Sequence, residues 1–173
     1  MLNLQKTAEN TVRYTPQQLY KALASAETHG LRNPWIRTQV RPRNNVSTAY
    51  GPVQLTEGLL RDYLNRRPEM FVGKARQTFA HRMLNQAQAF RRHGKTGARK
   101  RAWYNPAFDY GGKGNLPAAM RPHYQQVSMG IIDDMYRRGG YNLNALMRRW
   151  RGVSPDKVPT WRDRVLAALR KEQ

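Results

Sequence analysis

Apolar residues recur at intervals of three and four along most of this 173-residue chain. Such spacing places side chains on one face of an α-helix. The pattern predicts helices over residues 16–28, 57–66, 74–92, 120–137, 143–150 and 161–169. Gly152 provides a stop for the helix over residues 143–150. Alternation typical of a β-strand is scarce outside a short stretch at residues 35–40. The sequence therefore predicts a mainly α fold with little or no β-sheet.

The first predicted helix carries signals at both ends. Thr15 can cap it, Pro16 suits its first position, and Gln18 completes a capping box with Thr15. Gly30 provides a stop shortly after Glu27. We therefore expect Glu27 to lie in the last turn of this helix.

Glu27 is the one carboxylate between Glu9 and Glu57. Because it follows an apolar helix face, we expect partial burial, which favours the neutral form of a carboxyl group. The negative end of the helix dipole acts in the same direction. Both effects predict a proton donor near neutral pH. The alternative is a surface side chain paired with a nearby arginine such as Arg32 or Arg37.

A tight apolar turn follows at residues 50–55, where Gly51 and Pro52 fix the backbone before Gln54. With Glu27, this segment resembles the soluble lytic transglycosylases, peptidoglycan-cleaving domains with a lysozyme-like fold. That family has a catalytic Glu at a helix end, then a downstream Ser, a Gly, a hydrophobic pair and a Gln. Glu27-Thr28 is similar to the first piece, and Ser47 with residues 51–54 to the second. A late aromatic-Asn-x-Gly element is matched only in outline by residues 149–152, which lack the Asn.

The resemblance implies that Glu27 protonates the glycosidic oxygen between N-acetylmuramic acid and N-acetylglucosamine. It also implies a set of residues that shape the cleft and bind the glycan: Ser47, Tyr50, Gly51, Gln54 and Trp150. For Tyr50 the alternative is ordinary core packing. Similar transglycosylases use one Glu as acid and then base, and the muramoyl 6-hydroxyl attacks to leave a 1,6-anhydro sugar. The sequence leaves open whether this chain forms that product or hydrolyses the bond.

Glu57 is the candidate for a second acid, such as retaining lysozymes use. It can also be read as a first-turn residue of the second predicted helix, with Thr56 as its cap.

The resemblance implies a single lysozyme-like domain over residues 14–170. Residues 1–13 would form an N-terminal arm, and residues 71–115 a basic insertion relative to a minimal domain. Two glycine-containing or basic stretches, residues 93–101 and 109–115, predict loops or lids.

The sequence lacks cysteine, and its four histidines are scattered, so we expect no metal site and no cofactor. No apolar run reaches the roughly 18 residues that span a bilayer. The N-terminus shows no signal-peptide core. A wall-degrading enzyme without that signal needs another route, and carriage in a bacteriophage particle supplies one. We therefore expect a virion protein that acts in the host periplasm or cell wall during infection.

The formal net charge of +20 attracts polyanions. Acidic groups of the cell wall would serve as partners, and so would packaged DNA or other virion proteins. The alternative function is therefore a non-enzymatic basic virion protein that binds DNA or has a structural role. Its phosphate contacts would come from the arginine pairs at 91–92, 137–138 and 148–149 and the run at 99–101, although each could also be a solvated helix face.

Overall fold

The computed structural model describes residues 12–29, 34–35, 49–93 and 116–172, with side chains for all of these except 86–93. The described residues are helical and form no β-sheet, and an isolated bridge pairs Tyr50 with Leu55. The mainly α prediction is therefore confirmed. The elements are α1 (Pro16–Glu27), α2 (Glu57–Arg66), η1 (Pro68–Phe71), α3 (Lys74–His93), η4 (Ala118–Met120), α5 (Arg121–Arg138), α6 (Leu143–Arg151), η5 (Pro155–Lys157) and α7 (Pro159–Arg170).

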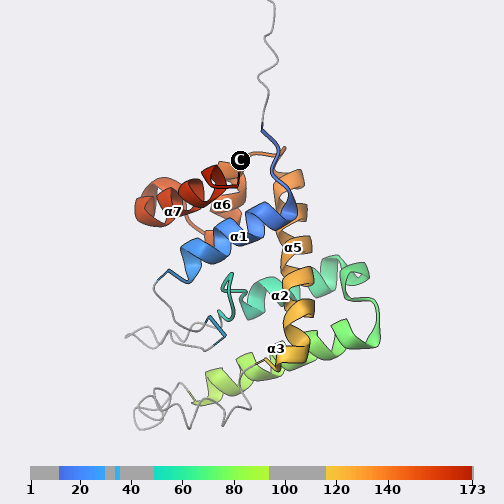
Figure 1. Cartoon of the computed structure of the whole chain (residues 1–173). Coiled ribbons are helices and arrows are strands. Elements are labelled where there is room, and N and C mark those ends of the chain that lie inside the picture. Colours follow the sequence, from blue (N-terminus) through green and yellow to red (C-terminus); the bar gives the residue numbers. More distant parts are fainter. Residues whose placement is uncertain (1–11, 30–33, 36–48, 94–115, 173) are drawn as a thin grey trace, which may run out of the picture.

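Helix α5 runs through the fold and contacts helices on both sides (Figure 1). One half of it contacts α1 and α6, and α1 also packs along α7. The other half contacts α3, which in turn packs on α2. The helices thus form two groups, α1 with α6 and α7, and α2 with α3, joined through α5.

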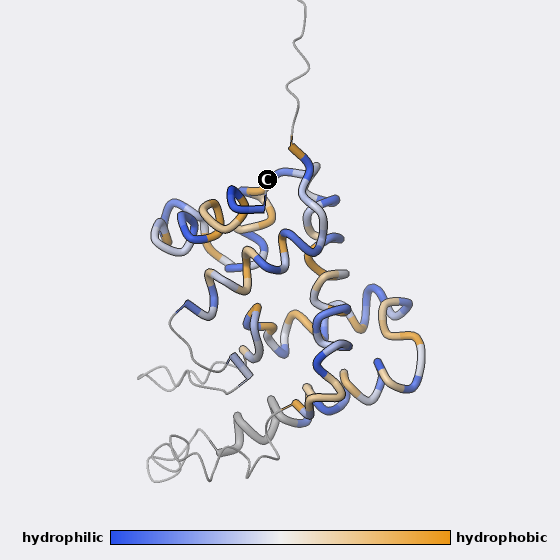
Figure 2. The backbone as a smooth tube through the Cα atoms, viewed as in Figure 1, coloured by the Kyte–Doolittle hydropathy of each residue, from blue (hydrophilic) through white to orange (hydrophobic). Residues whose placement is uncertain are grey.

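The predicted apolar faces make the core. Hydrophobic and hydrophilic residues are interspersed along the helices, as expected for amphipathic helices with one apolar and one polar face (Figure 2). Fully buried side chains come from every helix of the two groups; examples are Leu19, Leu23, Leu60, Phe79, Ile131, Leu146 and Val165. Helix α3 lies in the segment expected to be an insertion, yet its Phe79, Ala80 and Met83 are buried. This part of residues 71–115 belongs to the core.

The predicted ends of α1 and α6 are present. Thr15 Oγ1 accepts from the backbone N–H of Gln18 at 3.2 Å, and the Thr15 N–H donates to Gln18 Oε1 at 2.9 Å. Gly152 ends α6 with a left-handed φ of 75°. Glu27 and Arg151 are the last residues of α1 and α6.

The turn at residues 50–55 is hydrogen-bonded to α5. Two backbone hydrogen bonds join Tyr50 and Leu55 at 3.0 and 2.9 Å, and a third runs from the Gln54 N–H to the Gly51 carbonyl oxygen at 3.0 Å. Tyr124 Oη donates to the Tyr50 carbonyl oxygen at 2.7 Å. Gly51 has a φ of 77°, and a Cβ at this position would lie 2.5 Å from the Tyr124 ring. Only glycine therefore fits here without displacing Tyr124.

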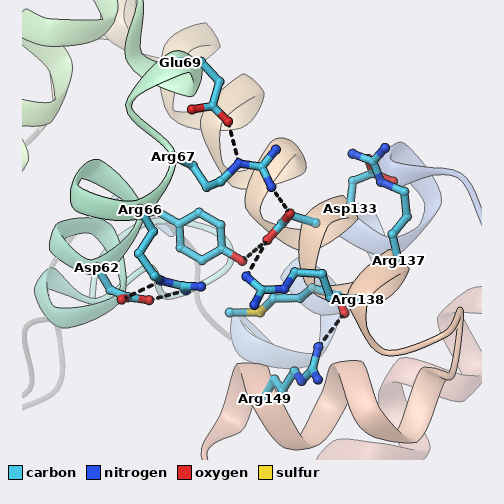
Figure 3. Close-up of polar contacts among 11 residues, drawn as sticks. Asp62, Arg66, Arg67, Glu69, Asp133, Arg137, Arg138 and Arg149 are labelled. Atoms are coloured by element: carbon cyan, nitrogen blue, oxygen red, sulfur yellow. Dashed lines mark hydrogen bonds and ion pairs between the residues drawn. The ribbon is translucent and has the colours of Figure 1, made fainter.

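Asp134 joins α5 to the end of α2. Its buried carboxylate accepts from Tyr63 Oη at 2.8 Å and from Arg67 Nη1 at 2.6 Å. Arg67 also binds Glu69, and Arg66 pairs with Asp62 on the outer face of α2 (Figure 3). Burial and the hydrogen bond to Asp134 raise the pKa of Tyr63 to about 12. This node links the group of α2 and α3 to α5 by charge as well as by packing.

Candidate functional site

The candidate site is built around Glu27, the last residue of α1. Thr28 follows as the C-cap of α1. The Thr28 Oγ1 donates to the Ala24 carbonyl oxygen at 2.7 Å and so helps to end the helix. The Glu27 side chain is only 4% exposed. The expected partial burial of this carboxyl group is therefore present in the structure.

Two side chains from the other end of the chain enclose the carboxyl group. Arg151 Nη1 donates to Glu27 Oε2 at 3.0 Å and to Oε1 at 3.3 Å. The guanidinium of Arg151 also lies 5.7 Å from the centre of the Trp161 ring. The buried Trp161 Nε1 lies beside the carboxyl group, but makes no hydrogen bond of regular geometry with any described residue. The carboxyl group at the end of α1 thus lies beside the end of α6 and the start of α7.

Burial raises the pKa of Glu27 above its ordinary value. The positive charge of Arg151 opposes this rise, and contacts with Trp161 and Arg151 oppose it to a smaller degree. The net direction is upward, as expected for a proton donor. The alternative interpretation of Glu27, pairing with an arginine, is also present in the structure, and Arg151 is the partner. Arg32 and Arg37 lie outside the described residues.

A surface cavity of about 510 Å³ opens over Glu27. It is lined by Ala26, Glu27, His29, Arg151, Lys157, Val158, Pro159, Thr160, Trp161 and Arg164. Glu27 is the only carboxylate among these described lining residues. Three of the others carry a positive charge, so the cavity presents a cationic wall around one acid.

The last two residues of α6 connect the predicted motifs. Trp150 Nε1 donates to the Val53 carbonyl oxygen at 3.2 Å, while Arg151 binds Glu27. The 50–55 turn and Glu27 therefore both contact the C-terminal turn of α6. The turn does not line the Glu27 cavity, however, as far as the described residues show.

The Tyr50 side chain lies in the core. Its side chain is completely buried, and its Oη accepts from the Leu116 N–H at 2.6 Å. Its ring packs against Trp35 and Tyr124, with centroids 6.2 and 6.4 Å away. A ring without exposed surface cannot stack on a sugar, so Tyr50 is a core residue and the alternative interpretation is the right one for its side chain.

The remaining members of the turn contact one another. Gln54 Nε2 donates to the Gly51 carbonyl oxygen at 2.9 Å, and Gln54 has a φ of 55°. Gly51 is buried and Gln54 is partly buried. Trp150 is partly buried as well, with its indole N–H held by Val53. In this structure these residues stabilise the turn, and Ser47 lies outside the described residues.

Glu57 is the buried first residue of α2. Arg61 Nη2 lies 2.9 Å from its Oε1, and Thr56 Oγ1 accepts from the Leu59 N–H at 3.3 Å as the helix cap. These contacts favour the first-turn interpretation. Glu57 does not line the cavity that contains Glu27.

Sequence analysis missed four residues of the site: Arg151 as the partner of Glu27, and Lys157, Trp161 and Arg164 as parts of the wall. The sequence places Trp161 and Arg164 one helical turn apart. It contains no signal that the start of α7 or the end of α6 faces Glu27, because 124 residues separate Arg151 from Glu27.

Among the described residues, no three His, Cys, Asp or Glu side chains gather as metal ligands would. No described helix combines the length and apolar character needed to cross a bilayer.

Comparisons with protein-family models, with curated proteins and with solved structures each found no match to this chain.

Proposed function

We propose that this protein cleaves the glycan strands of peptidoglycan, as a lytic transglycosylase or a lysozyme-type glycosidase, with Glu27 as general acid and base. The observation that carries the proposal is the Glu27 carboxyl group itself. It ends a helix, is buried, has a raised pKa, and lines an open cavity. Perturbed carboxyl groups in cavities are frequent at catalytic sites.

The chemistry needs a proton at the leaving oxygen. A neutral Glu27 would donate it to the oxygen joining N-acetylmuramic acid to N-acetylglucosamine, while positive charge develops at the sugar carbon. The resulting carboxylate would then take a proton from the attacking hydroxyl group. Burial supports the first step because it favours the protonated form.

A single-carboxylate route fits the site better than a two-carboxylate route. Glu27 has no second carboxylate beside it among the described residues that line the cavity, and Glu57 is engaged at the start of α2. We therefore favour attack by the muramoyl 6-hydroxyl group and a 1,6-anhydro product over hydrolysis.

The proposal includes a lysozyme-like arrangement of the helices, which the resemblance implies. Two helix groups share α5, and the short turn at residues 50–55 lies against α5 and α6. We further propose that a phage particle carries the protein and that it opens the cell wall during infection. The basic surface would bring it to the acidic wall.

Purified protein incubated with peptidoglycan sacculi tests the proposal. The expected result is release of soluble muropeptides by the wild type and loss of release by Glu27→Gln. Mass spectrometry of the products distinguishes anhydro ends from reducing ends, which differ by one water. Equal release by the variant would refute the role of Glu27.

The distribution of charge favours a second candidate function, a basic virion protein that binds DNA. Every Asp and Glu that the structure describes takes part in an ion pair, so the unpaired charges at its surface are mostly cationic. Such a surface binds phosphates without sequence preference. DNA retention that falls steeply with salt, together with no muropeptide release, would favour this candidate.

A further inference from the structure

Arg151 covers the proposed acid. The Glu27 side chain is 4% exposed, whereas that of Arg151 is 36% exposed, so the guanidinium lies on the solvent side of the pair. Arg151 donates to both carboxyl oxygens, so a glycosidic oxygen that enters the cavity competes with the guanidinium for the carboxyl group. If Glu27 acts on a polysaccharide, Arg151 must first move aside.

The cavity beside the pair has room and charge for an anion. Lys157 and Arg164 line it, and neither is in an ion pair with a described residue. Helix α7 starts at the same place with Pro159 and has no side-chain cap, so the positive end of its dipole adds to this charge. The cavity therefore suits an anionic group close to Arg151.

Trp161 provides a second observation at the same place. Its indole Nε1 is buried and has no hydrogen-bond partner of regular geometry in the described part of the chain. It lies beside Glu27, so it is a donor that stays with the carboxyl group when Arg151 leaves. The centre of its ring lies 5.7 Å from the guanidinium, within the range of a cation–π contact.

We propose that Arg151 is a receptor for a carboxylate carried by the glycan strand, and that it exchanges Glu27 for this carboxylate when the substrate binds. The inference rests on the proposed function. The substrate class is a glycan with free carboxylates on its lactyl or peptide substituents, in contrast to a neutral polymer of N-acetylglucosamine. Lys157 and Arg164 hold the same anionic group, and the exchange uncovers Glu27 only when such a strand is present.

Retention on two kinds of sacculi tests the receptor without requiring cleavage. Sacculi stripped of attached phosphate polymers are compared before and after their carboxylates are converted to neutral amides with a carbodiimide and glycinamide. The variants are Arg151→Gln, Arg151→Lys as the charge-preserving variant, and Arg170→Gln as a matched loss of one exposed α7 charge outside the cavity. Circular dichroism melting of each variant confirms that it folds.

Wild type should prefer native over amidated sacculi. Arg151→Gln should reduce that preference roughly threefold to fivefold more than Arg170→Gln, the range expected for a partly exposed ion pair. Arg151→Lys should retain most of the preference. Equal ratios for Arg151→Gln and Arg170→Gln would overturn the receptor.

Muropeptide release measured in parallel separates this proposal from the proposed function. If Arg151 is the receptor, Arg151→Gln should cleave native and amidated sacculi at similar rates, because its Glu27 is no longer covered. Cleavage by wild type that ignores amidation overturns the exchange but leaves the catalytic proposal intact. If neither wild type nor any variant cleaves sacculi, the catalytic proposal is refuted. The retention ratios still test the carboxylate site in that case.

Discussion

The indole N–H of Trp150 donates to the carbonyl oxygen of Val53 at 3.2 Å. This bond joins the end of α6 to the turn at residues 50–55, and the next residue, Arg151, reaches Glu27. The C-terminal turn of α6 is therefore the place where segments from the start, the middle and the end of the chain meet.

Trp150→Phe should destabilise the protein by about 1 kcal/mol, because the buried Val53 carbonyl loses its donor. Urea unfolding of wild type and variant measures the loss. Stability equal to that of wild type would mean that the Trp150 hydrogen bond contributes nothing.

Gly51→Ala should cost about 2 kcal/mol or more, because the new methyl group would lie 2.5 Å from the Tyr124 ring at a positive φ. Gly58→Ala in α2 is the control. No atom lies within 4 Å of its added methyl group, and alanine favours the helix, so stability should rise by up to about 1 kcal/mol. The free energies of unfolding give both values, and a Gly51→Ala variant as stable as wild type would contradict the close approach.

Asp134→Asn should cost about 2 to 3 kcal/mol, because the buried carboxylate that holds Tyr63 and Arg67 is lost. Its neighbour Asp133 pairs with Arg137 at 2.7 Å but is 28% exposed, against 5% for Asp134. Asp133→Asn removes the same charge from the same helix and should cost less than about 1 kcal/mol. Thermal or urea unfolding of the pair separates the buried node from the general effect of losing one acid, and similar losses would argue against the node.

The local structure followed from the sequence where the signals were local. Thr15, Gln18 and Thr56 predicted the starts of α1 and α2, and Gly152 the end of α6, because caps depend on residues one turn apart. The 3₁₀ turns η1, η4 and η5 were missed, since such short elements have no periodic apolar face. The proposed strand at residues 35–40 lies almost entirely outside the described residues, as do the two predicted loops except for His93.

The site was predictable only in part. Apolar neighbours and the helix end indicated that Glu27 would be buried with a raised pKa. Sequence could not identify Arg151 as its partner, because tertiary packing of α1 and α6 on α5, and of α7 on α1, brings the two residues together. Tyr50 was assigned to substrate because of its place in a motif, but the hydrophobic core and the Leu116 N–H determine where it lies.

Glu27→Gln should also change how stability depends on pH. Burial raises the pKa of Glu27 in the folded protein above its value in the unfolded chain. The stabilisation from this group is therefore fully present below the ordinary pKa and is lost as pH rises through the folded pKa. The amide of the variant does not titrate, so the variant should gain stability relative to wild type between about pH 4 and about pH 7.

Urea unfolding of wild type and Glu27→Gln at both pH values measures this difference. All other titrating groups are common to the two proteins and cancel in the comparison. A variant that loses stability relative to wild type as pH rises would show that Arg151 outweighs burial, and that Glu27 is held as a carboxylate.

The most direct test of the central claim is the rate of muropeptide release by Glu27→Gln beside that of Glu57→Gln, with both variants shown to be folded. If Glu27 supplies the proton, its variant should lose at least about a hundredfold in rate, the usual contribution of a general acid. Glu57→Gln should stay within a few-fold of wild type, because Glu57 belongs to the start of α2. A Glu27→Gln variant that releases muropeptides as fast as wild type would contradict the account.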